Sequence, residues 1–192
     1  MPRLPRMFSL ILLASILLTI GEAQAFDGSR RGFILGLGAG WGEARQALSV
    51  TLGDMEFDAS SDHSGIATDF RIGGGVSDQW LLYWTSQQVF FDSGGGAMAQ
   101  GIGAVGATWY SRAEAPALLL EGGVGLGGVA DLDGGGTDTG FGIMLGAGYE
   151  FARHWQLEAT WSHTEAGSVG LGEFGADASL STVRVTLCWM GY

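Results

Sequence analysis

The chain has no lysine, a single cysteine and only three prolines among its 192 residues. Because Cys188 is the only cysteine, no internal disulfide can form. All nine basic residues are arginines, and they are outnumbered by 20 acidic residues, so the net charge is −11. A chain this acidic offers few cations for phosphates, which argues against a nucleic-acid partner. No metal-binding or phosphate-binding motif indicates a cofactor.

Long apolar runs are confined to the first 25 residues. Arg3 and Arg6 precede an apolar segment that spans Phe8 to Ile20, and Ala23-Gln24-Ala25 follows as a small-x-small cleavage site. This arrangement predicts a signal peptide over residues 1–25 that is cleaved after Ala25. The exported domain is then 26–192, with seven basic and 19 acidic residues and a net charge of −12. No later run is long enough for a transmembrane helix.

Alternating apolar residues dominate the rest of the chain. From Gly140 to His163, apolar side chains alternate with glycine and polar residues in two runs joined by a short turn. Side chains of a β-strand point to opposite faces in turn, so each run has one apolar face and one small or polar face. The two runs are therefore predicted to form an antiparallel hairpin. The 35 glycines suit a strongly curved sheet, in which they relieve crowding.

The same alternation predicts eight strands. They are expected at Gly32–Trp41, Gly65–Gly74, Gln79–Phe91, Ala97–Tyr110, Ala117–Gly127, Gly140–Phe151, Trp155–His163 and Ser179–Met190. The third and fourth carry apolar residues on both faces, so their orientation stays open. Connections after the even strands are short, and those after the odd strands are mostly longer and rich in acidic residues. Short turns on one side and long loops on the other are typical of outer-membrane barrels.

Aromatic and charged residues indicate which face of the sheet meets lipid. Aromatic residues expected at strand ends predict two belts at the membrane interfaces. They are Trp41 and Trp161 at one end, and Trp80, Trp109, Tyr149, Trp155 and Trp189 at the other. Charged residues opposite the apolar stripes would meet inside a closed barrel, where two arginines and four acids can pair. They are Asp69, Arg71, Glu121, Glu150, Glu158 and Arg184.

These features together resemble the small eight-stranded outer-membrane barrels of Gram-negative bacteria, the outer membrane protein A/X-like superfamily. The resemblance implies an all-β fold: an eight-stranded antiparallel up-and-down transmembrane β-barrel in the bacterial outer membrane. It implies outer-membrane lipid and lipopolysaccharide as neighbours. It also implies the barrel-assembly machinery as a partner during insertion, which reads a terminal aromatic residue. Tyr192 is aromatic but one residue out of phase with the apolar stripe of the last strand.

The functional interpretation is a non-enzymatic structural or surface-interaction protein that acts through acidic external loops. An eight-stranded barrel has room only for side chains, so an open pore is not expected. Two alternatives remain. A soluble periplasmic ligand-binding barrel would turn its apolar stripes inward. A lipid A deacylase-like hydrolase needs a serine and histidine on one face, whereas Ser162 faces away from its neighbour His163.

One loop has the spacing of a weak calcium-binding sequence. Asp131, Asp133 and Asp138 are separated by glycines and could supply oxygen ligands to a divalent cation. An EF-hand loop would need an acidic residue where Gly142 stands, so the pattern favours a flexible acidic loop. Divalent cations at the external loops are therefore expected to bind only loosely.

Overall fold

The chain forms a closed antiparallel β-barrel whose strands pair in sequence order, β8 returning to β1. The computed structural model describes residues 29–52, 55–133, 137–171 and 174–192. The predicted signal peptide lies outside the described residues. No helix in the described part is long and apolar enough to cross a membrane. The strands are β1 (Gly32–Leu52), β2 (Met55–Ser77), β3 (Trp80–Asp92), β4 (Ala97–Tyr110), β5 (Ala117–Asp131), β6 (Thr137–Ala152), β7 (Trp155–Leu171) and β8 (Phe174–Gly191).

The apolar stripes face outward and the charged residues face inward. Phe33, Leu145 and Leu157 are each about half exposed, at 49%, 58% and 50%. Arg71 and Glu158, by contrast, are each 1% exposed. A soluble barrel would bury its apolar face, so this arrangement suits a barrel surrounded by hydrocarbon, with every strand edge closed. The alternative of a soluble periplasmic barrel is therefore wrong.

The structure also settles the two strands whose orientation the sequence left open. In β3, Tyr83, Thr85 and Gln87 point inward and are buried, while Trp80 and Trp84 are exposed outside. In β4 the even-numbered residues face the interior. Both strands carry inward apolar residues near their ends, and for that reason alternation alone could not orient them.

Glycines allow neighbouring strands of the barrel to approach closely. A Cβ atom added at Gly40 would lie 2.0 Å from the carbonyl oxygen of Val185 on β8. One added at Gly125 would lie 2.0 Å from the carbonyl oxygen of Gly103 on β4. Real Cβ atoms do not approach backbone so closely, so larger residues at these positions would force strands apart.

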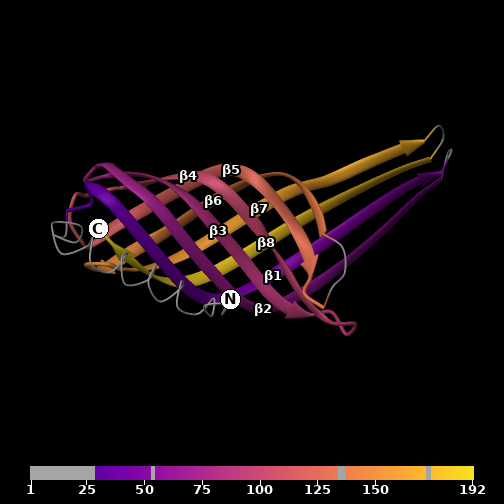
Figure 1. Ribbon diagram of the computed structural model, residues 1–192, viewed down its shortest axis with the longest axis horizontal. Coiled ribbons are helices and arrows are strands. Elements are labelled where there is room, and N and C mark those ends of the chain that lie inside the picture. Colours follow the sequence, from indigo (N-terminus) through magenta and orange to yellow (C-terminus); the bar gives the residue numbers. More distant parts are fainter. Residues whose placement is uncertain (1–28, 53–54, 134–136, 172–173) are drawn as a thin grey trace, which may run out of the picture.

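Four strands continue far beyond the barrel at the end away from the C-terminus (Figure 1). The prediction that residues 42–64 and 164–178 form loops was wrong. Their described residues extend β1, β2, β7 and β8 as paired strands. The prediction of a loop over residues 128–139 was also largely wrong, because β5 continues to Asp131 and β6 begins at Thr137. The turns at the other end are short, as predicted.

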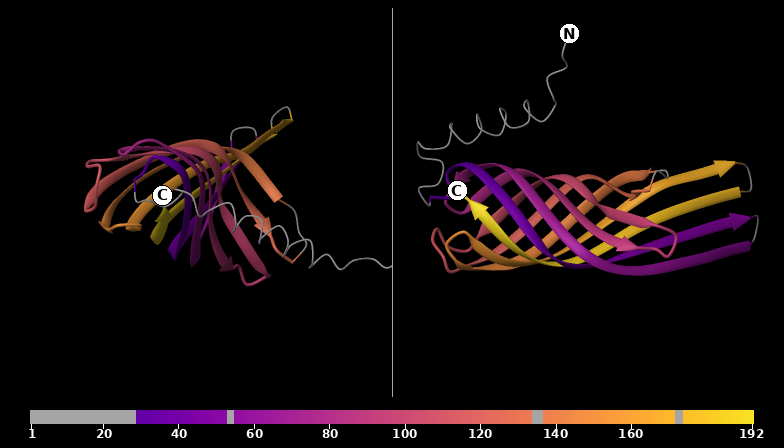
Figure 2. Two further views of the ribbon diagram at one scale, coloured as in Figure 1. Left: turned by 60° about the vertical axis from the view of Figure 1, so that its left-hand side comes forward. Right: turned by 60° about the horizontal axis from the view of Figure 1, so that its bottom comes forward.

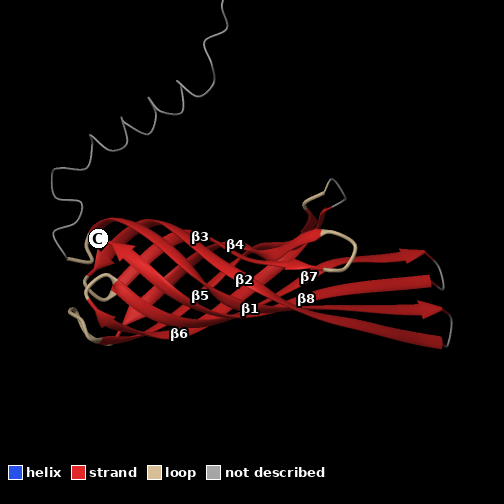
Figure 3. Ribbon diagram, turned by 90° about the horizontal axis from the view of Figure 1, so that it is seen from below, coloured by secondary structure: helices blue, strands red, loops and turns tan. Residues whose placement is uncertain are grey.

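The extensions make one sheet rather than two separate hairpins, because β1 pairs with β8 as far as Leu52 and Phe174. The strand order there is β2-β1-β8-β7, and the hairpin β3–β4 ends much nearer the barrel than these strands do (Figure 3). We call residues 42–52, 55–65, 166–171 and 174–183 the projecting sheet. It continues past the other strand ends at the barrel mouth, as the right-hand view of Figure 2 shows.

Candidate functional site: a filled lumen beneath a projecting sheet

The centre of the lumen holds one arginine among three carboxylates. Arg71 on β2 pairs with Asp69 on the same strand, with Glu121 on β5 at 2.8 Å, and with Glu158 on β7. All four side chains are almost completely buried. Closure of the barrel brings these strands together across the lumen. Burial of ionic groups requires such pairing, because an isolated charge would be far less stable there.

Neutral side chains complete the hydrogen bonds of this cluster. Thr85 and Gln87 each donate to Asp69 at 3.1 Å. The Tyr83 hydroxyl lies 2.8 Å from Thr108 Oγ1 and donates to Glu121 at 3.1 Å. One oxygen of Glu121, Oε1, has no partner among the described residues. The cluster is thus nearly saturated by the protein itself.

Two of the six predicted lumen charges are bound differently from the prediction. Arg184 is buried, but it contacts Gln87 and Thr160 and forms no ion pair with the described residues. Its Nη1 atom has no partner there. Glu150 lies at the end of the barrel that carries the C-terminus, where it pairs with Arg30 instead. The expectation that two arginines and four acids form a single cluster was therefore wrong.

Arg30 closes this end of the barrel and was missed as a lumen residue. Its guanidinium pairs with Glu150 and donates to the backbone oxygens of Asp78, Arg112 and Ala113 at 2.9, 2.7 and 2.9 Å. It also lies 3.9 Å from the ring centroid of Tyr110. The signal was present in the sequence, because position 30 is in phase with the buried Ile34.

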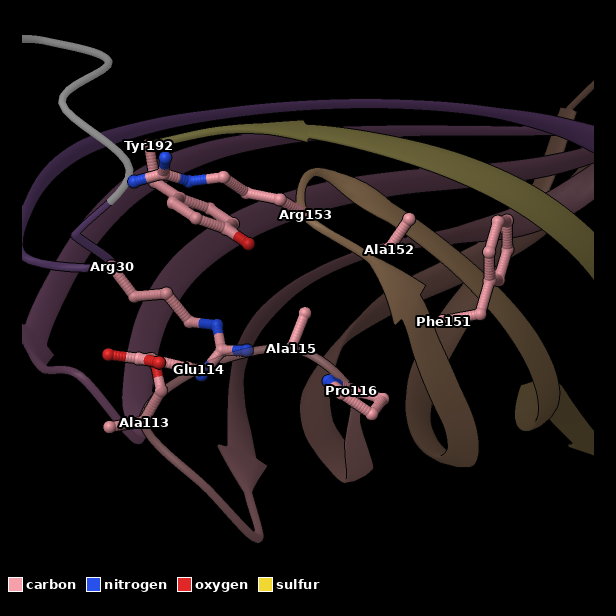
Figure 4. Close-up of a pocket in the computed structure, with 9 residues that line it drawn as sticks. All are labelled: Arg30, Ala113, Glu114, Ala115, Pro116, Phe151, Ala152, Arg153 and Tyr192. Atoms are coloured by element: carbon pink, nitrogen blue, oxygen red, sulfur yellow. The ribbon is translucent and has the colours of Figure 1, made fainter.

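Tyr192 points into the barrel, as its phase indicated, and is 2% exposed. Its hydroxyl donates to Glu150. Burial, with the hydrogen bond to Glu150, raises the pKa of Tyr192 to about 12, so the hydroxyl keeps its proton. Figure 4 shows Arg30 and Tyr192 with Arg153 and Glu114 around a cavity of about 430 Å³ at this end. The role of Tyr192 as an assembly signal stays a prediction.

The aromatic residues predicted as belts all occupy the outward face. Five of them cluster toward the C-terminal end of the barrel, where Trp80 pairs with Trp109 and Trp155 pairs with Trp189 across strands. Trp41 and Trp161 lie in the middle of β1 and β7 rather than at their ends. The prediction of strand ends was wrong for these two, because the strands continue past them into the projecting sheet.

Two of the three acidic residues proposed for calcium accept hydrogen bonds from backbone amides. Asp133 accepts from the Ala97 N–H at 3.0 Å, and Asp131 accepts from the Asp133 N–H at 2.8 Å. Asp138 stands on β6 opposite Val129. Among the described residues, the group that meets the geometry of a metal site is instead Asp69, Glu158 and Cys188. Both carboxylates of that group already pair with Arg71, which occupies the role of a cation.

A serine and a histidine meet on the outer surface, in a pairing that the sequence did not predict. His163 Nδ1 on β7 lies 2.9 Å from Ser181 Oγ on β8, its partner in the strand register. His163 also stacks on Trp161, with 5.9 Å between ring centroids. The outward face of both strands changes here from apolar to polar. Sequence proximity could suggest only Ser162, which is buried on the inner face.

Comparison with known proteins agrees with this architecture. Residues 10–188 match the outer membrane protein beta-barrel domain family, and the chain belongs to that family. It is a bacterial outer-membrane β-barrel protein. A search of curated protein sequences gave no match. With the family established, the end bearing the C-terminus and the short turns is assigned to the periplasm, and the projecting sheet to the cell exterior.

Several solved outer-membrane barrels are similar to the chain at low sequence identity. Neisserial surface protein A (NspA) is 14% identical, with a TM-score of 0.52, over 84% of this chain and 97% of that one. OprG from Pseudomonas aeruginosa is 11% identical, with a TM-score of 0.49, over 85% and 98%. Ail from Yersinia pestis is 12% identical, with a TM-score of 0.41, over 81% and 99%.

Proposed function

We propose that this protein is a non-enzymatic outer-membrane barrel that binds partners at the cell surface through its projecting sheet and has no open pore. The observation that carries the proposal is a large polar and acidic sheet standing above a lumen filled by buried side chains. The lumen serves as a rigid base, because its arginine–carboxylate cluster joins β2, β5 and β7. The outward apolar face contacts outer-membrane lipid and lipopolysaccharide.

The charge of the external surface supports this role. Arg45 is the only cation of the described external segments, and it lies 3.6 Å from Asp62. The exposed acids of these segments are Glu43, Glu56, Asp58, Asp62, Asp92, Asp133, Asp138 and Glu165. Such a surface attracts cationic partners over a range set by ionic strength. Divalent cations are a second class of ligand that this surface could hold.

A shortened variant tests the proposed function. Replacing residues 46–61 and 166–178 each by Asn-Gly joins register partners with two-residue turns and leaves the barrel body intact. We expect both proteins to show the gel shift of a folded barrel on boiling and neither to release solutes from liposomes. The full-length protein should bind poly-lysine more tightly than the shortened variant, which loses the exposed acids Glu56 and Asp58, as measured by interferometry in nanodiscs. Solute release by the full-length protein, or equal poly-lysine binding by both, would contradict the proposal.

A second candidate function is a hydrolase acting on lipid esters, and the contact between His163 and Ser181 favours it. A serine hydroxyl that donates to a histidine is the arrangement used for nucleophilic attack on an ester. The pair lies where the outer surface passes from apolar to polar, the depth at which lipid ester groups lie. Among the described residues, no acidic side chain forms a hydrogen bond or ion pair with His163, so the surface-binding function has the stronger support.

Lipid composition separates these two functions. If the pair is catalytic, outer membranes that contain the protein should lose acyl chains by mass spectrometry, and Ser181→Ala should abolish that loss. Ser179→Ala is the matched control, because Ser179 lies two residues away on the same strand face. If the surface-binding function is correct, membranes that contain the unchanged protein, Ser181→Ala or Ser179→Ala should all have the same lipid profile as membranes that lack the protein.

A further inference from the structure

The projecting sheet reverses the polarity pattern of the barrel below it. In the membrane-facing part of β1 the outward residues are apolar, as at Phe33 and Trp41. Farther along the same strand the outward residues become polar, as at Arg45 and Ser49, while Leu48 turns to the inner face. The register between β1 and β2 is continuous through this change, so the reversal is a property of the sequence and not of a bulge.

The inner face of the projecting sheet is mainly apolar, and it is exposed at Leu48 and Phe57, away from the barrel. Phe57 on β2 is 58% exposed, and Leu48 on β1 is 45% exposed. Ala59 lies opposite Leu48 in the register, and Leu180 follows on β8. A cavity of about 340 Å³ lies at the base of this face, lined in part by Leu48, Ala59 and Leu180. Exposed apolar surface in contact with water marks a site of interaction.

The outer margin of this face is a free strand edge. Pairing between β2 and β3 begins at Ile66 and Phe90, and His63 still stacks on Phe91 of β3, so in the described structure residues 55–62 have a neighbouring strand only on the β1 side. Along this edge acidic side chains point outward at Glu56, Asp58 and Asp62, in alternation with the inward Phe57. An unpaired edge offers a row of backbone donors and acceptors to another extended segment.

Charge selects among the possible occupants of the edge. Side chains opposite one another on paired strands lie about 5 Å apart, and like charges there destabilise the pair. A second copy of the chain would bring its own β2 acids against these acids. A segment with basic residues at every second position would instead meet Glu56, Asp58 and Asp62, and its other face would extend the apolar surface at Phe57.

We propose that the free edge of β2 binds an extended segment of another protein in which basic and apolar residues alternate, and that this segment adds a fifth strand to the projecting sheet. The inference rests on the proposed surface-binding function and specifies its partner. Backbone hydrogen bonds along the edge supply affinity, and the alternation of charge and apolar side chains supplies register and selectivity.

Two peptides of identical composition test the inference. One alternates lysine and valine over eleven residues, and the other has the same residues in an order without that alternation. Binding to the full-length protein in nanodiscs is measured by interferometry. We expect the alternating peptide to bind at least about tenfold more tightly, because only it can match both faces of the edge at once. Isotope-edited infrared spectra should show the bound peptide as β-strand.

Matched variants locate the binding site. Glu56→Lys/Asp58→Lys/Asp62→Lys should remove the preference for the alternating peptide. Glu43→Lys/Asp138→Lys/Glu165→Lys makes the same change in net charge away from the edge and should keep it. Phe57→Ser, at an exposed position, should also reduce the preference without affecting the gel shift of the folded barrel.

The outcomes distinguish this inference from the proposed function. Equal binding of both peptides would overturn the strand addition while leaving an electrostatic surface-binding role. Failure of both peptides to bind would overturn the inference and the proposed function together. Self-association of the protein through β2, detected by cross-linking of a cysteine placed at position 60, would also overturn the inference, since the edge would then be occupied by a second copy.

Discussion

Arg71→Met is expected to destabilise the barrel by about 3–5 kcal/mol, which is the usual effect of removing one partner from a buried ionic cluster. Asp69, Glu121 and Glu158 all pair with this guanidinium, and their side chains are no more than 4% exposed. The substitution would leave three neighbouring carboxylates without a cation. The measurement is the urea midpoint of the purified protein in detergent, followed by the gel shift between folded and boiled forms.

Two further variants show that this loss comes from the cluster. Arg31→Met removes an ion pair with Asp78 in which the arginine is 67% exposed, and its effect should stay within about 0.5 kcal/mol. Combining Arg71→Met with Asp69→Asn, Glu121→Gln and Glu158→Gln removes the uncompensated charges. The combined variant should regain much of the stability lost by the single one. Equal effects of Arg71→Met and Arg31→Met would show that the cluster does not stabilise the barrel.

Arg30→Ala is expected to have the second large effect, a loss of about 3 kcal/mol on the same basis. The substitution leaves the carboxylate of Glu150 buried with only Tyr192 as a partner, and it removes the donor to three backbone oxygens. The unfolding midpoint in urea again measures the effect. Because these contacts join the start of the domain to two turns, the periplasmic end should also become more sensitive to protease.

Arg112→Ala is the matched control for Arg30→Ala. The Arg112 side chain is exposed, and only its backbone oxygen accepts the hydrogen bond from Arg30. The alanine substitution keeps that oxygen and should leave both the urea midpoint and the protease pattern unchanged. A similar loss in the two variants would point to the net charge of the periplasmic end rather than to the Arg30 contacts.

The structure confirms the predicted orientation of the strands. This orientation could be predicted because it depends only on the alternation of side chains along each strand. Alternation places Phe33 and Leu145 on one face and Arg71 and Glu158 on the other wherever the strands lie. All six charges assigned to the lumen are buried. The same reasoning applied to position 30 would have placed Arg30 inside, but Arg30 precedes the first predicted strand, Gly32–Trp41, and was not considered with it.

The loops were predicted less well, for a related reason. Residues 42–50 and 55–64 mostly turn polar side chains outward and apolar ones inward, the reverse of the pattern that marks a lipid-facing strand. A search for apolar outward stripes therefore ends each strand at the membrane boundary, near Trp41 and Trp161. The chain continues as paired strands beyond that boundary, because strands can also pair where their outward face contacts water instead of lipid.

The sequence by itself determined the eight strands, the direction of their apolar faces and the acidic character of the external surface, because each follows from the order of neighbouring residues. Tertiary structure decided which partners meet. Arg71 reaches Glu158 only because closure sets β2 across the lumen from β7, and His163 meets Ser181 only through the register of two strands. Strand register and closure depend on contacts between residues far apart in the chain, so local alternation cannot specify them.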